Sequence, residues 1–306
     1  MIKINLYKIN YFCLFLIFCS LLIVSCSSAP KEIGDIKILR SQAEAWLEAG
    51  NKEAGQGKFK NALTILSEAK SNAIMADDIS LIIRVCLSRG NVLYSLGNKK
   101  DAFEEWNHAV SEAEKFGNPE LLSVSKIYLA RGNLISEERD AELVYKEVNN
   151  ESEKISKSRL YIAFSWQVKG LALRAMALNK EAEKERDEAK VLFKNAEAAF
   201  MRSLEINEKD LYLENASYDW YIIASIRSLS GYPDEAVKAL ESSIAVDRRI
   251  ENSWGIAASY RAMGDVYFNT DKLKAKEAYI RARTIYAAML NEEETAVMDK
   301  RIGSLK

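Results

Sequence analysis

The chain has 306 residues, of which 48% are hydrophobic and 28% are charged, a balance that is ample for a folded core and excludes a disordered protein. Its 13 glycines and 3 prolines are too few for a β-sandwich or barrel with many tight turns, so the composition favours helices. The formal net charge is −1, with no basic tract or stripe, which argues against DNA or RNA as a partner.

The N-terminal residues predict a targeting segment. Lys3 and Lys8 precede an apolar run from Tyr11 to Val24, which is too short to span a bilayer comfortably as a permanent anchor. A short apolar run behind positive charges is typical of a secretory signal peptide. We therefore expect residues 1–25 to be removed.

The end of this segment, "LIVSC" from Leu22 to Cys26, resembles the lipobox of bacterial lipoproteins. The resemblance implies that Cys26 is lipidated, with palmitate among its acyl chains, and that residues 26–35 form a tether. It also implies a protein anchored in the bacterial cell envelope and facing the periplasm. Ser27 follows Cys26 instead of Asp, so the outer membrane is favoured by the enterobacterial rule. The alternative is an ordinary cleaved signal in which Cys26 is incidental.

Only one cysteine other than Cys26 remains after such a cleavage, because Cys13 and Cys19 leave with the signal. Cys86 then has no partner for an intrachain disulfide. Its neighbours Val85 and Leu87 predict that it is a small buried hydrophobic residue.

The body of the chain shows an internal repeat of 40 residues. Glycines and alanines fall on one grid, with a single 14-residue insertion in the fourth repeat. The grid positions are Gly50, Gly90, Ala130, Gly170, Ala224 and Gly264. A glycine inside a helical pattern costs about 0.5–1 kcal/mol relative to alanine, so its recurrence indicates a close helix crossing.

A second column of alanines stands twelve residues after the glycines. It comprises Ala62, Ala102, Ala182 and Ala236. Most of them begin a pattern of alanine, a large apolar residue four positions later and a small residue three beyond that, as in Ala62, Leu66 and Ala69. We predict that the glycine of a first helix faces the alanine of a second helix packed antiparallel to it.

These two columns resemble the tetratricopeptide repeat (TPR), whose first helix carries W-x2-L-G-x2-Y and whose second carries A-x3-F-x2-A. The match covers most of the chain, and Gly90, Ala102 and Trp106 are among its clearest positions. The resemblance implies an all-α fold, a superhelical solenoid of about six helix hairpins over residues 36–306. Residues Leu290 to Lys306 are expected to cap the last repeat. The competing fold is an irregular helical bundle.

Two repeats depart from the pattern. In the third, only nine positions separate Gly132 from Ala141, so we expect an irregular hairpin. In the fourth, Ala182 is followed by a second signature that begins at Ala196. We interpret the 14 inserted residues as one long charged helix.

No constellation of catalytic residues is visible. His108 is the only histidine, which leaves no second histidine for a triad or a metal site. The phosphate-loop, dinucleotide and nucleophile-elbow motifs are absent, as are paired cysteines at zinc-binding spacing. We therefore predict a protein that is not an enzyme and that needs no cofactor or metal.

The TPR resemblance implies that the first helices line a concave groove, with the residue after the glycine pointing into it. Asn51, Asn91 and Asn133 occupy that position in the first three repeats. Their amides could hydrogen-bond the backbone of an extended peptide, next to Arg84 and Tyr94. The alternative is that these asparagines are merely tolerated at exposed sites.

The residue before the glycine is a cation in repeats two to four, namely Arg89, Arg131 and Lys169. Three cations in one column could hold an acidic group of a partner. The alternative is that their heads pair with glutamates of the chain itself, such as Glu104, Glu105 or Glu138.

The second half of the chain is more apolar. The stretch Ser158 to Leu178 is apolar nearly all round, and Tyr218 and Tyr221 lie in a second such stretch. Helices of this kind are usually buried. Part of this surface could instead line an internal apolar pocket.

These observations lead us to expect a lipid-anchored scaffold that binds a protein or peptide in its concave groove. The alternative is a TPR partner of a periplasmic solute-uptake (TRAP-type) system that binds a small apolar ligand in its central pocket. Self-association of the chain stays open.

Overall fold

The computed structural model describes residues 35–305, and every regular element within this range is an α-helix. The thirteen helices of this range are α2 (Asp35–Gly55), α3 (Phe59–Met75), α4 (Ile79–Ser95), α5 (Lys99–Phe116), α6 (Pro119–Ile135), α7 (Ala141–Ser152), α8 (Arg159–Ala182), α9 (Arg186–Lys209), α10 (Leu213–Leu229), α11 (Pro233–Arg249), α12 (Ser253–Tyr267), α13 (Lys272–Ala288) and α14 (Glu292–Gly303). The signal peptide, Cys26 and nearly all of the tether that we expect lie outside the described residues.

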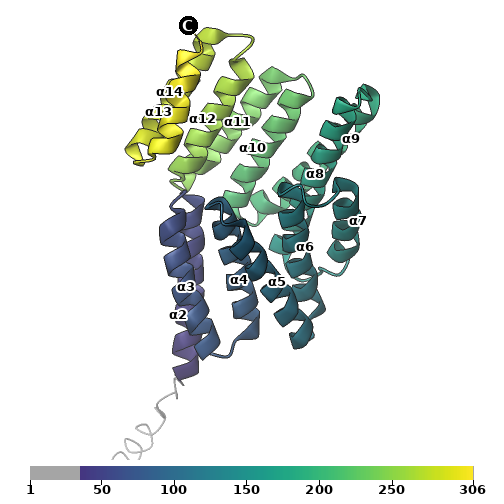
Figure 1. Cartoon of the computed structure of the whole chain (residues 1–306), viewed down its shortest axis with the longest axis vertical. Coiled ribbons are helices and arrows are strands. Elements are labelled where there is room, and N and C mark those ends of the chain that lie inside the picture. The colour runs from purple at the N-terminus through teal and green to yellow at the C-terminus, as the bar shows by residue number, and fades with distance from the viewer. Residues whose placement is uncertain (1–34, 306) are drawn as a thin grey trace, which may run out of the picture.

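The helices pack as six successive hairpins, from α2–α3 to α12–α13, with α14 against the last one (Figure 1). The predicted period is confirmed, because α4 and α6 begin 40 residues apart at Ile79 and Pro119, as do α10 and α12 at Leu213 and Ser253. Six of the thirteen described helices have 17 residues, which corresponds to about 25 Å. The all-α solenoid predicted from the sequence is therefore correct.

The fourth hairpin is where the prediction of one long helix is wrong. Helices α8 and α9 have 24 residues each, against 17 in α10 and α11, so the insertion is shared equally by the two arms. The turn between them contains Lys184 in the left-handed region at φ 66°. Sharing the insertion keeps the hairpin antiparallel and in register. The second-helix signature that packs against Gly170 therefore begins at Ala196 instead of Ala182.

The glycine column makes the close crossings that the repeat predicts, and at Gly50 and Gly170 the backbone oxygen of the facing alanine lies within 3.5 Å of an added Cβ, but a larger side chain lies closer. Each glycine lies under the large apolar residue that follows the alanine by four positions. A Cβ added to Gly50 would lie 2.6 Å from Leu66. It would lie closer still to Trp106 at Gly90, to Phe200 at Gly170 and to Tyr279 at Gly264. The glycine therefore provides space for a ring or branched chain, while the alanines bring the backbones together around it.

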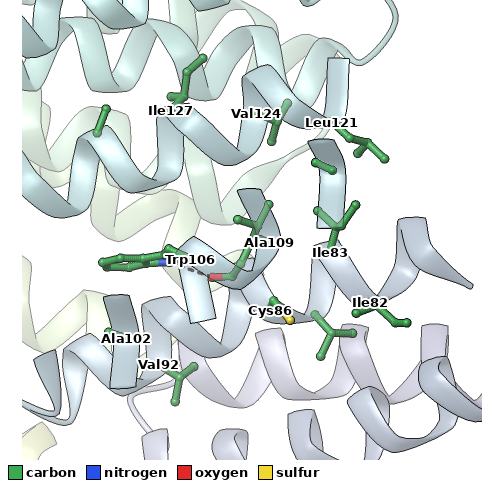
Figure 2. Close-up of a cluster of buried hydrophobic side chains, with 14 of the residues drawn as sticks. Ile82, Ile83, Cys86, Val92, Ala102, Trp106, Ala109, Leu121, Val124 and Ile127 are labelled. Carbon is green, nitrogen blue, oxygen red and sulfur yellow. Dashed lines mark hydrogen bonds between the residues drawn. The ribbon is translucent and has the colours of Figure 1, made fainter. Parts of the chain in front are cut away.

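Trp106 shows this packing most fully. It is completely buried, and its indole nitrogen lies 3.4 Å from the carbonyl oxygen of Leu87, to which it donates (Figure 2). The other edge of the ring lies against Gly132 of the next hairpin, where an added Cβ would overlap the indole. Gly132 thus serves the preceding hairpin, which explains why its spacing to Ala141 is short.

The apolar core follows the solenoid as three clusters of buried side chains. The first extends from α2 to α8, the second from α8 to α13, and the third joins α12, α13 and α14. Met298 of α14 is fully buried, while three glutamates occupy the first turn of that helix. The last helix thus covers the final hairpin with one face.

The solenoid curls until its two ends touch. The first hairpin lies end-on to α12 and α13 (Figure 1), and the rings of Phe59 and Trp254 meet edge to face at 5.9 Å. Gly57 lies directly under the same indole, because a Cβ there would be 2.7 Å from Trp254. This contact joins the two ends of the solenoid around its concave side.

Candidate protein-binding groove

The concave side holds a cavity of about 1230 Å³. Its walls come from the inner helices α2, α4, α6 and α8 and from the turns α9–α10 and α11–α12. The side chains that matter for its chemistry are Glu44, Glu48, Asn51, Lys52, Arg84, Asn91, Tyr128, Tyr161, Phe164, Leu211, Glu214 and Arg249. The combination of aromatic, amide and charged groups suits a ligand that is itself partly apolar and partly polar.

Aromatic rings form one wall of the groove. Tyr128 of α6 and Phe164 of α8 are stacked with centroids 4.2 Å apart and planes inclined by 28°. Tyr161 lies one turn before Phe164, and burial raises the pKa of its hydroxyl while the nearby charge of Arg84 opposes that rise. Within residues 35–305, Arg84 makes no ion pair, so its exposed guanidinium is available to a ligand.

The opposite wall is acidic. Glu214 at the start of α10 has its pKa raised, first by burial and then by the charge of Asp247, and Lys52 opposes the shift. Glu44 and Glu48 come from α2 on the same side as Lys52. A ligand in the groove would therefore lie between the cation on α4 and carboxylates on α2 and α10.

Two turns at the edge of the groove hold strained residues. Leu211 and Glu251 have φ of 60° and 56°, a left-handed conformation that costs a side-chain-bearing residue about 1–2 kcal/mol. Leu211 is also 68% exposed, so most of its side chain is open to solvent. Sequence reasoning missed both residues, although they stand 40 positions apart on the repeat grid.

Of the ten groove residues predicted from the sequence, Asn51, Arg84 and Asn91 line the cavity. The third hairpin does not continue the predicted row of asparagines, because Asn133 does not line the cavity. Arg131 takes the place next to Asn91, whose Oδ1 accepts from Nη1 of Arg131 at 3.4 Å. The reason is the two-residue displacement of Gly132 from the grid, which moves Asn133 away from the row.

Tyr94 and Arg89 bind within the chain. The Tyr94 hydroxyl donates to the carbonyl of Ile135 at 3.0 Å, which ties α4 to the end of α6. Nε of Arg89 donates to Glu105 at 2.8 Å, and Lys70 binds the same carboxylate. This is the internal pairing that the alternative interpretation of Arg89 expects.

The three predicted cations do not share one environment. Arg131 binds Asn91 of the groove, whereas Lys169 is buried to 6% exposure with its ammonium 4.5 Å from the centre of the Trp166 ring. Burial lowers the pKa of Lys169. Tyr218 and Tyr221 lie on α10, beyond the cavity wall, and both are half-buried.

A buried polar network beside the groove was not predicted. Asp219 of α10 is completely buried and accepts hydrogen bonds from Gln167 at 2.8 Å, Ser203 at 2.8 Å and Asn207 at 2.7 Å. Burial raises its pKa to about 7 despite these three donors. The only sequence signal is that Ser203 and Asn207 interrupt a helix face that is alanine in the first two repeats.

The Cys86–His108 pair has the residue types of a nucleophile and a base. Sγ of Cys86 lies 3.6 Å from Nδ1 of His108, but burial raises the pKa of the thiol to about 12. The thiol is therefore neutral at physiological pH and behaves as the buried hydrophobic group predicted from its neighbours. Among residues 35–305, no cluster of three potential metal ligands occurs, and none of the helices has the length and apolar character needed to span a bilayer.

Comparison with known proteins identifies the fold. No family model matches the sequence, and no curated protein matches it significantly. Among solved structures, a Rap protein complexed with Competence and Sporulation Factor is similar over 86% of this chain and 74% of its own, with a TM-score of 0.55 and 14% identity.

Two further structures are more distant. The quorum sensor NprR from B. thuringiensis covers 99% of this chain and 88% of its own at 14% identity, with a TM-score of 0.43. The TPR2AB domain of yeast Sti1 in complex with pHSP90 is similar over 87% of this chain and 98% of its own, with 15% identity and a TM-score of 0.31. Together with the hairpin geometry, the similarity to the Rap protein shows that this chain has a TPR-type helical solenoid fold.

Proposed function

We propose that this chain is a non-enzymatic scaffold that binds a segment of another protein in its concave groove, and that lipid on Cys26 holds it in the bacterial cell envelope. One observation supports the binding role above all others. The cavity of about 1230 Å³ is built from six elements on the concave side of a solenoid whose ends meet at Phe59 and Trp254.

The size and lining of the groove favour a protein segment. Its volume exceeds the range of about 300–1,000 Å³ that is usual for small-molecule sites. Asn51 and Asn91 offer amide donors and acceptors to a peptide backbone, and the Tyr128–Phe164 stack offers a surface for an apolar side chain. The Rap protein of similar fold is itself complexed with Competence and Sporulation Factor.

A small apolar ligand, as in a TRAP-type uptake system, is the second candidate. The aromatic wall of Tyr128, Tyr161 and Phe164 favours it, whereas the charges of Glu48, Arg84 and Glu214 would be left unpaired beside an apolar molecule. Native mass spectrometry of the purified full chain distinguishes the two, because a co-purifying small molecule of defined mass would support the second candidate.

Site-directed photo-crosslinking in the native envelope tests the proposal. A photoreactive residue in place of Asn51 or Asn91, inside the groove, should give a discrete adduct with one partner. The same residue in place of Lys60, which is exposed on α3 and does not line the cavity, should give none. Equal adducts from Lys60, or none from the groove positions, would contradict it.

Arg84→Glu provides a matched variant. Arg84 is exposed and has no ion-pair partner in the described part of the chain, so reversal of its charge should leave the melting temperature unchanged while it weakens the Asn51 adduct. Anchoring is tested separately by palmitate labelling of the wild type and Cys26→Ala. Equal labelling would exclude the lipid on Cys26.

A further inference from the structure

The first three hairpins, α2 to α7, have two edges that differ from each other. The start of α2, the α3–α4 turn and the α5–α6 turn lie along one of them, because successive helices run antiparallel. Arg40 of α2 binds Asp78, which caps the start of α4, at 2.9 Å, so α2 begins beside the α3–α4 turn, at the lower side of Figure 1. We call this the anchor edge, because the chain that follows Cys26 joins the solenoid there.

Four large apolar side chains at the anchor edge are about half exposed. They are Ile38 of α2, Ile74 and Met75 of α3 and Phe116 of α5, with exposed fractions between 46% and 57%. Three of them stand in the last turn of their helix, so they project beside the turns that form this edge. Exposed apolar side chains that gather in one place, instead of being scattered singly, mark an interaction surface.

The opposite edge of the same hairpins is charged and partly covered. Its exposed apolar residues are Leu96 and Leu143, and Leu143 closely follows residues 137–140, all of which are charged and exposed. At the first hairpin, this edge already contacts the other end of the solenoid through Phe59 and Trp254. An apolar surface free of other parts of the chain is therefore found at the anchor edge.

The length of the expected tether determines which edge can reach a bilayer. From Cys26 to Asp35 the chain spans at most about 32 Å, even when it is fully extended. Helix α2 has 21 residues and extends about 32 Å from the anchor edge to the opposite edge. A lipid on Cys26 thus lets the anchor edge meet the bilayer without restraint, whereas the opposite edge could reach it only with a fully extended tether.

We propose that the anchor edge docks on the lipid bilayer and inserts Ile38, Ile74, Met75 and Phe116 at the boundary between headgroups and acyl chains. The inference rests on the lipid at Cys26 that forms part of the proposed function. Each side chain gains free energy by leaving water. Because the tether makes the contact intramolecular, a few such side chains suffice to hold it.

A bilayer fits this surface better than a second copy of the chain does. A stable protein interface takes about 20–30 residues from each partner, far more than the four apolar residues of the anchor edge. A bilayer needs no matching shape, and four side chains from three helices along one edge suit a flat partner.

The first experiment measures contact with lipid at two matched positions. The full lipidated chain carries a bimane label on Met75→Cys or on Leu96→Cys, one at each edge. It is reconstituted into vesicles of phosphatidylethanolamine and phosphatidylglycerol, with and without bromine on the acyl chains. Cys86 does not compete for the label, because it is buried and its pKa is raised to about 12. Brominated lipid should quench the label at position 75 and leave the label at position 96 unchanged.

Two results of this experiment would overturn the proposal. One is equal quenching at both positions, or none at position 75. The other is emission at position 75 that changes with the density of protein in the vesicle but not with bromine, because a second copy would then cover the edge.

The second experiment adds Phe116→Ser to the chain labelled at position 75. The ratio of docked to undocked molecules should fall about tenfold, because the exposed half of the ring no longer leaves water on docking. Leu143→Ser is the control, since Leu143 is 50% exposed at the opposite edge, and it should leave quenching unchanged. Equal effects of the two substitutions, at unchanged melting temperatures, would contradict the proposal.

The lipid and the docking surface fail separately, because intact mass spectrometry of the purified chain detects the lipid on Cys26 independently of quenching. If the lipid is present and positions 75 and 96 are quenched alike, the anchor stands and the docking surface is wrong. If the lipid is absent and position 75 alone is quenched, the anchor is wrong and the edge binds the bilayer by itself. Absence of both the lipid and the quenching would refute both proposals.

Discussion

The first two hairpins and the fourth and fifth hairpins build the same helix contact from different chemistry. On the second helix of each, the residues seven and eleven positions after the column alanine are fully or almost fully buried. They are Ala69 and Ala73 in α3, Ala109 and Ala113 in α5, Ser203 and Asn207 in α9, and Ser243 and Asp247 in α11. At these positions the first two hairpins therefore pack through alanine methyl groups, whereas the fourth and fifth hairpins pack through hydrogen-bonding side chains.

This difference shows that the 40-residue repeat determines where the helices contact each other but not which side chains make the contact. The polar half satisfies Asp219 with three donors, yet Oδ1 of Asn207 and Oδ2 of Asp247 have no partner in the described part of the chain. Such a layer costs stability compared with alanine, and it adds the raised pKa of Asp219 to the pH dependence of those hairpins.

The largest effect on stability is expected when a polar side chain replaces a buried alanine of the first two hairpins. Ala113→Asp places a carboxyl group at a fully buried site in α5 that belongs to the first apolar cluster. Overpacking and unpaired polar atoms together should lower the free energy of unfolding by about 5 kcal/mol, measured with urea.

The mirror substitution Asp247→Ala is the control. It removes an acid that already has one oxygen without a partner, so it should cost less than about 1 kcal/mol. Equal losses from Ala113→Asp and Asp247→Ala would show that the two halves do not differ in the way described.

The next effect is the pH dependence of the polar half. Asp219 has a pKa of about 7 in the folded chain against its ordinary value of 3.8, so between these values the folded chain holds a proton that the unfolded chain has lost. Stability should therefore fall as pH rises from about 4 to about 7, by up to about 4 kcal/mol, and level off above.

Urea unfolding at a series of pH values checks this, and Asp219→Asn is the comparison. The variant cannot ionise at this position, so the difference between its profile and that of the wild type isolates the contribution of Asp219. Parallel profiles would mean that Asp219 is already ionised in the folded protein at acidic pH.

A smaller effect on stability tests the contact between the column glycine and the large apolar residue above it. Gly90→Ala would push a methyl group into the buried Trp106 ring, and we expect a loss of about 2 kcal/mol. The first hairpin pairs Gly50 with Leu66 instead, so Trp106→Leu should relieve part of that clash. A double-mutant cycle by chemical denaturation should give a coupling of about 1 kcal/mol, whereas strictly additive losses would contradict the contact.

The smallest effect concerns the turns. Leu211→Gly and Leu290→Gly each replace an exposed left-handed leucine, at φ of 60° and 57°, and should raise stability by about 0.5–1 kcal/mol. Only Leu211 lines the groove. The two variants should therefore show similar rises in melting temperature, while partner capture weakens in Leu211→Gly alone.

The sequence predicted the helix hairpins, their period and the close crossing at each glycine, because these depend on residues within one repeat. It paired Gly90 with Ala102 instead of Trp106, since spacing along the chain does not give the direction of a side chain. It also indicated one helix for the insertion after Gly170, because charged residues such as Lys184 suit a helix as well as a turn.

The groove depends on contacts that no local pattern contains. Asn51 and Asn91, each the residue after a column glycine, line the cavity, but Arg131 instead of Asn133 lies next to Asn91 after a shift of two residues. The approach of Phe59 to Trp254 joins segments almost 200 residues apart, and repeat spacing says nothing about how far a solenoid curls.

The most direct measurement is an experimental structure of the full chain with the partner that the Asn51 position captures. The account predicts that the partner's backbone runs through the concave groove between the Tyr128–Phe164 stack and the turn at Leu211. A partner seated on the outer helices α3, α5 or α9, with the groove left to solvent, would contradict it.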